Sequence, residues 1–545
     1  SQPMRLLLAL ATALATAEAV FPNVPGVNLT CTNCSQKEQE TLNVGIALCY
    51  NFNRPMAVPI LEDLVASSPK CAMCWHVLAY AHAPYINRPL MTEDAARAGG
   101  AAARRARELV RGETLSPKEF GLIIAQSVRF PTDPKGDQRK DAVLYSEAMR
   151  SLAEKHPDDA DILAFAAEAS MLLMCDSDGY HFYESDERTP KPGTTWALAA
   201  LEHVLTELTP AHALAEHMYI HLTETSAPDL AARAAHVADV LQPQFTGSDA
   251  QHLLHMSAHT YARIGRYADA VEAGIRATKS DAVYLRRGDV PNGPAHDLVC
   301  LIYAASTDGQ SRVATSYGET LTSVYRASPD RNDGPGPEEA WAFPLTTHIR
   351  FGRWAEALDA SEALWPPPRD WPFAHVLRSF ARATALAAVG DPAEARSELA
   401  VLAGALPKVP QNLRQLAHVA NASAVAAVLW HEKDSDGAKA AMASAMREET
   451  SWGYNEPPAW FQPTLQCYGQ ILLARGEAAF AQNAFEKDLA VWPTNAWSLR
   501  GRAAAMALQP KKYSEAEVRA ADALAAKAWE RADAGPLVSS CAFAS

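Results

Sequence analysis

The sequence lacks an excess of basic side chains. Its 545 residues include 49 lysines and arginines against 63 aspartates and glutamates, a formal net charge of −14. Nucleic acids and anionic membrane surfaces are bound by basic faces. The charge balance therefore argues against nucleic acid as a partner. It leaves peptides, proteins and small molecules as the partner classes to consider.

Two hydrophobic patterns are also missing. Beyond residue 19, no apolar run reaches the roughly 20 residues that a membrane-spanning helix needs. We therefore expect no transmembrane segment in the mature chain. No stretch alternates apolar and polar residues for long enough to indicate a β-sheet, so the pattern predicts an all-α protein.

Familiar catalytic motifs are absent as well. The sequence contains no G-x-S-x-G elbow, no phosphate-binding P-loop, no G-x-G-x-x-G after a strand and no H-E-x-x-H. Any chemistry would have to come from another set of side chains.

The N-terminus has the features of a secretory signal peptide. Met4-Arg5 precedes the apolar run 6–17, and the motif Ala17-Glu18-Ala19 follows at the end of this run. A basic start, a short apolar core and an A-x-A ending are typical of such leaders; a buried first helix is the alternative. We expect residues 1–19 to be a leader, and the mature protein to be extracellular, periplasmic or in an organelle lumen.

Five of the nine cysteines lie in the segment 20–75, which we interpret as an N-terminal cap. These candidates for disulfides are Cys31, Cys34, Cys49, Cys71 and Cys74. In an oxidising compartment, two C-x-x-C pairs favour disulfides. The same spacing also suits a four-thiolate zinc site. Asn28, Asn33 and Asn421 are glycosylation acceptors if the source is eukaryotic.

The rest of the chain repeats a helical-hairpin pattern. A 34-residue unit over 248–281 contains the turn Gly265-Arg266-Tyr267, followed by small residues at helical spacing. Similar turns recur at Gly352, Gly390 and Gly476. This is the pattern of tetratricopeptide repeats, which stack into a solenoid with a right-handed superhelical course. We expect one solenoid over 76–325, with an irregular insertion at 175–195, and a second over 337–545, joined by a linker near 326–336.

Histidines mark the centre of the first solenoid. His217, His221 and Glu224 share one helix face by their spacing, and His252, His255 and His259 form a second stripe. Paired imidazoles one turn apart are a common way to hold a transition metal. With His296, the candidate ligands are His217, His221, His255 and His259, for Zn, Cu or Fe. Convergence of their nitrogens within about 4–5 Å would support a metal; otherwise the histidines line a polar groove or make structural hydrogen bonds.

Several further motifs carry a family resemblance. They are His217-x3-His221-x2-Glu224, His255-Met256-x2-His259-x-Tyr261-x-Arg263-x-Gly265-Arg266-Tyr267, His296, Cys71-Ala72-Met73, Asn87-Arg88-Pro89, Pro192-Gly193-Thr194, Glu456-Pro457-Pro458-Ala459-Trp460 and Asn495-Ala496-Trp497-Ser498-Leu499. Over Cys71 to Asp533, the chain resembles a group of exported bacterial tetratricopeptide-repeat proteins. The group has a further histidine where this chain has Val299. The resemblance implies the fold and no reaction.

From these patterns we expect a binding or scaffold protein. Its concave groove would receive a peptide, protein or small ligand through Tyr261, Arg263, Glu224 and Asn87. The alternative is a metal-dependent enzyme that uses the central histidines, and the third interpretation is a purely structural scaffold.

Overall fold

The computed structural model describes residues 25–112, 114–176, 179–246, 250–327, 336–535, 537 and 541–543. The expected leader and most of the expected linker lie outside these ranges. Within them the fold is all-α, as the sequence predicts, and consists of packed helical hairpins. Among the described residues, no helix combines the length and apolar character needed to cross a membrane.

The chain divides into two compact units. Among the described residues, the first unit contains those within 25–260 and 276–292, and the second contains those within 261–275 and 293–543. The chain passes between the units within the helical hairpin over 251–287, which carries the second histidine stripe.

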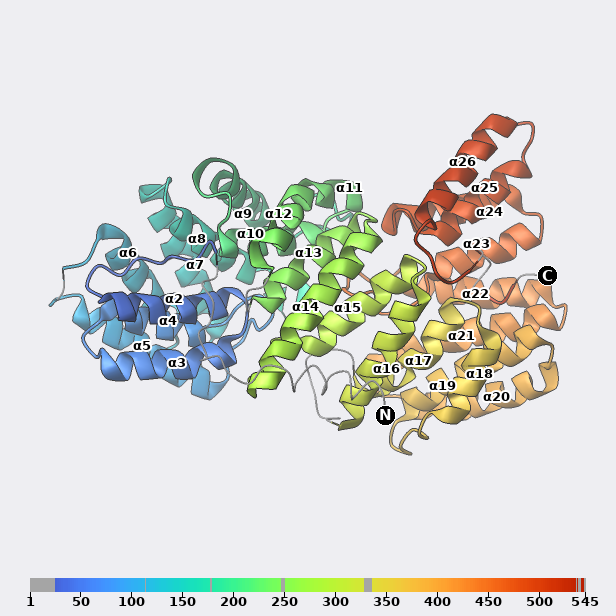
Figure 1. The fold of residues 1–545 in the computed structure, drawn as a ribbon, viewed down its shortest axis with the longest axis horizontal. Helices are drawn as coiled ribbons and strands as arrows, with labels where there is room; N and C mark the ends of the chain where they lie inside the picture. The colour runs from blue at the N-terminus through green and yellow to red at the C-terminus, as the bar shows by residue number, and fades with distance from the viewer. Residues whose placement is uncertain are drawn as a thin grey trace. The chain divides into compact units, whose positions relative to one another are not determined.

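The helices of the first unit pack mainly against their neighbours in the chain. They are α2 (Gln36–Tyr50), α3 (Arg54–Ser67), α4 (Ala72–His82), α5 (Glu93–Leu109), α6 (Pro117–Gln126), α7 (Gln138–Lys155), α8 (Ala160–Leu172), α9 (Pro192–His203), the π-helical turn η1 (Val204–Leu208), α10 (Ala213–Glu224), α11 (Pro228–Ala231), the 3-10 turn η2 (Ala232–Ala234) and α12 (Ala235–Phe245). Two further helices belong to this unit only in part. They are α13 (Gln251–Arg263), up to residue 260, and α14 (Tyr267–Arg287), from residue 276 onward. In Figure 1, α2 to α5 run alongside one another.

The second unit continues the same hairpin pattern. Its helices are α15 (Pro294–Thr307), α16 (Ser311–Ala327), α17 (Pro337–Arg350), α18 (Trp354–Ala363), α19 (Pro372–Val389), α20 (Pro392–Ala405), the 3-10 turns η3 (Leu406–Lys408) and η4 (Gln411–Leu413), α21 (Arg414–His431), α22 (Ser435–Glu449), α23 (Thr464–Ala474), α24 (Ala478–Val491), α25 (Ala496–Ala507) and α26 (Glu515–Ala528). Successive helices such as α19 and α20, or α21 and α22, pack closely against each other.

The hairpin turns depend on glycine, as the repeat pattern predicts. Gly265, Gly352, Gly390 and Gly476 all have positive φ, between 65° and 92°. A Cβ on Gly265 would also lie 2.4 Å from the carbonyl oxygen of Pro493. Only glycine meets both the left-handed conformation and this close backbone approach without strain.

Small residues let the hairpin helices approach closely. In α8, Ala164, Ala166 and Ala167 are fully buried, and α21 buries Ala424 and Ala426 in the same way. Each unit has a hydrophobic core of its own, formed between its helices. The described residues of the expected N-terminal cap, 25–75, contribute to the core of the first unit through α2 and α3.

The irregular insertion contains the short strands β1 (Cys175–Asp176) and β2 (Gly179–Tyr180). They pair antiparallel, with Cys175 opposite Tyr180. No strand was predicted here, because two residues are too few to show an alternating pattern. Phe182, just after β2, is completely buried and fixes the insertion against the first unit.

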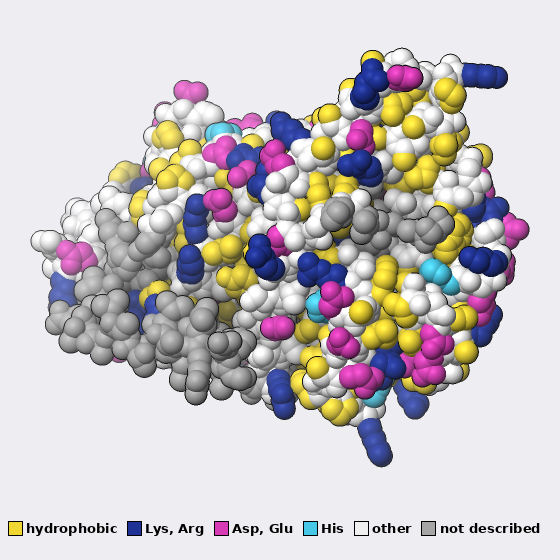
Figure 2. Space-filling model, turned by 45° about the vertical axis from the view of Figure 1, so that its right-hand side comes forward, with side chains coloured by type: hydrophobic (Ala, Val, Ile, Leu, Met, Phe, Trp, Pro, Cys, Tyr) yellow, Lys and Arg dark blue, Asp and Glu magenta, His cyan; other side chains and the backbone are white. Residues whose placement is uncertain are grey.

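Charged side chains of both signs are mixed on the surface. On the face shown in Figure 2, lysine and arginine side chains are interspersed with aspartate and glutamate.

Candidate metal centre

The helix α10 carries the first pair of histidines inside the first unit. All twelve of its residues are buried. His212 begins the helix, because its Nδ1 accepts a hydrogen bond of 3.2 Å from the amide of Ala215 while its Nε2 lies 3.0 Å from Asp161. One helical turn separates His217 from His221, and their ring centroids are 4.9 Å apart. The predicted stripe on one helix face is therefore present.

The start of α13 brings a third histidine to this pair. The amide of Leu253 donates to Asn51 Oδ1 at 3.1 Å, and Gln251 Nε2 donates to the carbonyl of Asn292 at 2.7 Å. These bonds fix the first turn of α13 beside the turn that follows α2. The ring of His252 then lies 5.0 Å from that of His217, measured between centroids.

Hydrogen bonds define the tautomers of the two histidines on α10. His217 Nδ1 lies 2.6 Å from the carbonyl oxygen of Tyr50, and His221 Nδ1 lies 2.7 Å from Glu224 Oε1. Both partners can only accept, so each Nδ1 carries the proton and donates it. The Nε2 lone pair of each ring is thereby left available. Both Nε2 atoms are buried and have no hydrogen-bond partner among the described residues.

The three rings bring one nitrogen each close to the other two. One nitrogen from each of His217, His221 and His252 lies within 4.8 Å of the others. All three side chains are nearly inaccessible, with exposed fractions of 0%, 1% and 3%. Burial lowers the pKa of His221 to about 3, and burial together with the neighbouring His221 holds the pKa of His217 well below 6.5. The imidazoles of His217 and His221 are therefore neutral near pH 7, which is the form that binds metals.

An aromatic residue covers this histidine triad, which we define as His217, His221 and His252. The ring of Phe52 lies 4.2, 5.8 and 5.3 Å from the three imidazole rings, respectively, between centroids. Phe52 has φ of +56°, in the left-handed region that a bulky side chain rarely adopts. Such a conformation persists only where the surrounding packing holds it, often at functional sites. Phe52 was not predicted as part of the site, because an aromatic residue between two helices gives no sign of its backbone angle.

The insertion contributes a second aromatic ring to the centre. Tyr180 packs edge-on against His221, with 5.3 Å between ring centroids. Its hydroxyl donates to Asn87 Oδ1. Asn87 was predicted as a groove residue. In the structure, this exposed residue holds Tyr180, which in turn contacts the triad.

Glu224 connects the triad to the rest of the α13 stripe. Its Oε1 accepts from His221, and its Oε2 lies 3.6 Å from His259 Nδ1. The rings of His255 and His259 are 4.4 Å apart between centroids, and both are buried. Of the predicted ligands, His217 and His221 thus meet at the triad, where the third ring is His252. His255 and His259 lie farther along α13.

The remaining predicted site residues belong to the second unit. His296 has Cys300 Sγ at 3.8 Å and Glu456 Oε2 at 3.6 Å from its Nε2. Tyr261 and Arg263 are both 4% exposed. The guanidinium of Arg266 lies over the ring of Tyr261, and that of Arg263 lies over Tyr454. Within the second unit these two predicted groove residues thus make packed aromatic contacts.

Cysteines form two disulfides among the described residues. One joins Cys31 to Cys34, as the C-x-x-C motif suggested, and the other joins Cys467 to Cys541. Cys49 was predicted as a disulfide candidate, but it is a buried thiol, because its position on α2 faces the core. Burial raises its pKa to about 12. The pairing of Cys467 with Cys541 was not predicted, since residues so far apart in the chain give no spacing signal.

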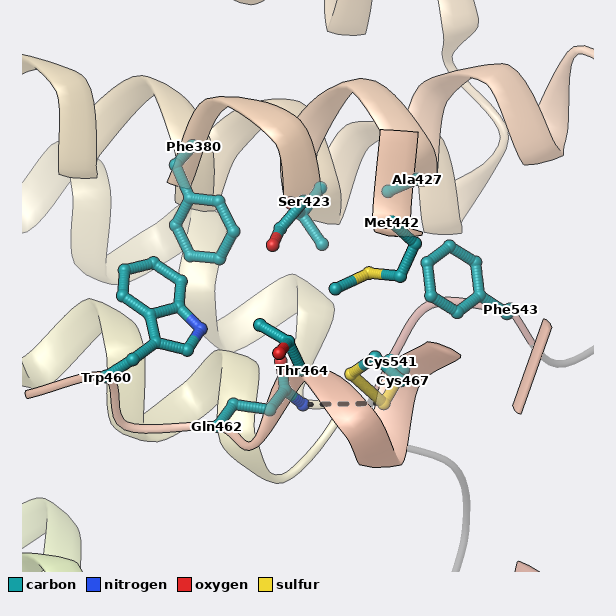
Figure 3. Close-up of a pocket in the computed structure, with 11 residues that line it drawn as sticks. Phe380, Ser423, Ala427, Met442, Trp460, Gln462, Thr464, Cys467, Cys541 and Phe543 are labelled. Atoms are coloured by element: carbon teal, nitrogen blue, oxygen red, sulfur yellow. Dashed lines mark hydrogen bonds between the residues drawn. A yellow bond between two sulfur atoms is a disulfide. The ribbon is translucent and has the colours of Figure 1, made fainter. Parts of the chain in front are cut away.

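The second disulfide borders a small cavity in the second unit. Figure 3 shows Phe380, Met442 and Trp460 around it, with Cys467 and Cys541 at one side. Its volume is about 10 Å³, which is room for about one water molecule. This cavity therefore does not accommodate an organic ligand.

Comparison with known proteins gives no function. No known family matches the sequence, and no curated protein matches it. Two solved structures are similar over most of the chain. "Crystal structure of Ypp1" has 11% identity over 92% of this chain and 88% of that chain, with a TM-score of 0.36. "Structure of Naa15/Naa10 bound to HypK-THB" has 12% identity over 91% and 73%, with a TM-score of 0.23. The family resemblance noted in the sequence stays a prediction.

Proposed function

We propose that this helical-repeat protein binds a transition-metal ion in its first unit, on the imidazoles of His217, His221 and His252. The observation that carries the proposal is the pair of buried Nε2 atoms on α10, which have no hydrogen-bond partner among the described residues. Leaving a buried polar atom unsatisfied costs about 1–3 kcal/mol. An ion at the triad would use both lone pairs and so offset this cost.

The hydrogen bonds behind the ligands support the same proposal. Histidines that bind metals generally donate their second N–H to a carboxylate or a backbone carbonyl, which fixes the ring and raises its basicity. Glu224 accepts this hydrogen bond from His221, and the carbonyl oxygen of Tyr50 accepts it from His217. The same two rings lie beside each other and beside His252, with one nitrogen of each of the three within 4.8 Å of the others.

Three imidazole ligands suit zinc, copper or iron. They leave at least one coordination position for water or a small ligand. Zinc held in this way activates water by lowering its pKa to about 7, whereas copper or iron would transfer electrons. The burial of the triad favours an ion over a peptide as the occupant, because a peptide needs accessible side chains. Tyr180 and Phe52 would restrict access to the ion.

Metal analysis of two variants tests the proposal. The full chain, without a histidine tag and without chelator, is compared with His217→Ala/His221→Ala and with His236→Ala. His236 lies exposed on α12 and is the matched control. We expect the double variant to contain about one equivalent less zinc, copper or iron than the other two proteins.

Folding of the double variant is checked by circular dichroism, and Glu224→Gln provides a milder change that keeps the triad. Equal metal content in wild type and a folded double variant would overturn the proposal. A groove for a peptide or small ligand would then be the better account of the centre, and its partner would be sought by affinity capture.

We also propose export along the secretory route. The Cys467–Cys541 disulfide supports it, because such bonds persist in oxidising compartments. Cell fractionation and N-terminal sequencing test this proposal: a mature chain that begins after Ala19 is expected, and an uncleaved cytosolic chain would contradict it.

A further inference from the structure

A second group of metal-binding side chains lies at the start of the first unit, away from the histidine triad. Cys31 and Cys34 are in the loop before α2, and Cys71 and Cys74 are in the first turn of α4. Between the two motifs, the sulfur of Cys71 lies 3.6 Å from that of Cys31 and 3.3 Å from that of Cys34. The sulfurs of Cys34 and Cys74 are 3.8 Å apart. We propose that these four cysteines, when reduced, form a tetrathiolate zinc site.

The sulfur spacing carries the proposal. In a tetrahedral site with Zn–S bonds of about 2.3 Å, neighbouring sulfurs are about 3.8 Å apart. Three sulfur–sulfur distances between the motifs lie between 3.3 and 3.8 Å. The sulfurs of Cys31, Cys34 and Cys71 all lie within 4.8 Å of one another. Cys74 contacts this group through Cys34, so small shifts of the side chains would bring all four sulfurs around one ion.

The backbone around the four cysteines is positioned without any cross-link. The amide of Cys31 donates to Gln39 Oε1 at 2.8 Å, which ties the loop to α2. The amide of Thr32 donates to Glu119 Oε1 at 2.6 Å, and the side chain of Asn33 donates to the carbonyl of Thr114 at 2.9 Å. The loop is therefore held at both α2 and α6, so reduction leaves its cysteines facing α4.

The helix α4 is suited to hold thiolates. Cys71 is its N-cap, and the sulfur accepts a hydrogen bond of 3.1 Å from the amide of Cys74. An amide donor and a helix N-terminus both stabilise the negative charge of a thiolate. Exposed fractions of 7% for Cys71 and 0% for Cys74 protect the bound ion from solvent.

The Cys31–Cys34 disulfide is the oxidised alternative of the same group. Its reduction takes two electrons and two protons, which a dithiol supplies by exchange while becoming a disulfide itself. Zinc then binds the four thiols as thiolates and displaces four protons. Zinc at this site would stabilise the first hairpin directly. The four thiolates come together only in the folded chain, so the free energy of zinc binding adds to the free energy of folding.

Cobalt substitution distinguishes this site from the histidine triad. The full chain is produced in a reducing cytoplasm, freed of metal with chelator and dithiol under inert gas, and titrated with Co²⁺. Sulfur ligands give cobalt an intense thiolate-to-metal absorption in the near-ultraviolet, which imidazole ligands do not give. We expect this absorption to saturate at one equivalent, and Zn²⁺ to abolish it.

Three variants define the outcome. The absorption should be lost in Cys71→Ser/Cys74→Ser, but kept in Cys175→Ser, whose buried thiol lies in β1 outside the group. It should also be kept in His217→Ala/His221→Ala, so failure of the histidine proposal leaves this test unaffected. If the double serine variant does not fold, Cys34→Ser, in the partly exposed loop, replaces it. A folded, reduced wild-type chain that binds Co²⁺ without thiolate absorption, or does not bind it at all, would overturn the proposal.

Discussion

Replacing Glu224 by glutamine changes the charge behind the triad without changing its shape. Glu224 Oε1 accepts from His221 Nδ1 at 2.7 Å, and both side chains are at most 1% exposed. Glutamine still offers an oxygen to this N–H, but the hydrogen bond is no longer charge-assisted, and such bonds are about twice as strong as neutral ones. The imidazole becomes a weaker base and thus a weaker ligand. Loss of an outer-shell partner typically lowers metal affinity by about 10–100-fold, equivalent to about 1.4–2.8 kcal/mol.

The assay is a competition titration of the metal-free full chain against a chromophoric chelator of known affinity. Glu202→Gln is the matched control, because Glu202 accepts from the hydroxyl of Tyr219 at 2.9 Å on another side of α10. We expect the Kd of Glu202→Gln to stay at the wild-type value. If Glu224→Gln binds metal as tightly as wild type, Glu224 does not support a metal ligand and the reasoning fails.

Three further predictions follow from the structure. Phe52→Ala should lower the free energy of unfolding by about 3–5 kcal/mol and speed the extraction of metal by a chelator. The buried control Phe165→Ala, whose ring contacts Tyr50, should lower the free energy of unfolding without changing the rate of metal extraction. An unchanged extraction rate in Phe52→Ala would show that the ring of Phe52 does not cover the ion. Burial raises the pKa of Asp488 from 3.8 to about 6, so the folded state binds its proton more tightly. The associated stability is full below pH 3.8 and is lost as pH rises through about 6, a change of about 3 kcal/mol. Urea unfolding from pH 3.5 to 7.5 should show this fall relative to Asp488→Asn, and parallel profiles would contradict it. Reducing the Cys467–Cys541 disulfide, which spans 74 residues, should cost about 4.5 kcal/mol by loop entropy. Cys541→Ser should unfold at a lower urea midpoint that no longer responds to reductant, and equal midpoints would refute this estimate.

The repeat architecture could be read from local patterns. Turns such as Gly265 require a left-handed backbone that glycine adopts without strain, and alanines at helical spacing allow close packing. These are properties of a few neighbouring residues, so the sequence displays them directly. The pair His217 and His221 was predictable for the same reason, because i and i+4 share a helix face in any α-helix.

The composition of the histidine triad could not be read in this way. The spacing in α13 named His255 and His259 as candidate ligands and left out His252, which the structure brings to the pair on α10. That choice depends on Asn51, which binds the first turn of α13 from a segment about 200 residues earlier in the chain. Phe52 was hidden as well, because its positive φ is imposed by packing rather than by its side-chain type.

Local sequence thus determined the helices, their glycine turns and the histidine pair on one face. Tertiary structure alone decided the third histidine, the aromatic cover and the pairing of Cys467 with Cys541. The physical reason is that side-chain periodicity acts over one or two helical turns. Convergence of segments far apart in the chain is instead fixed by how hairpins pack and by the hydrogen bonds that join them.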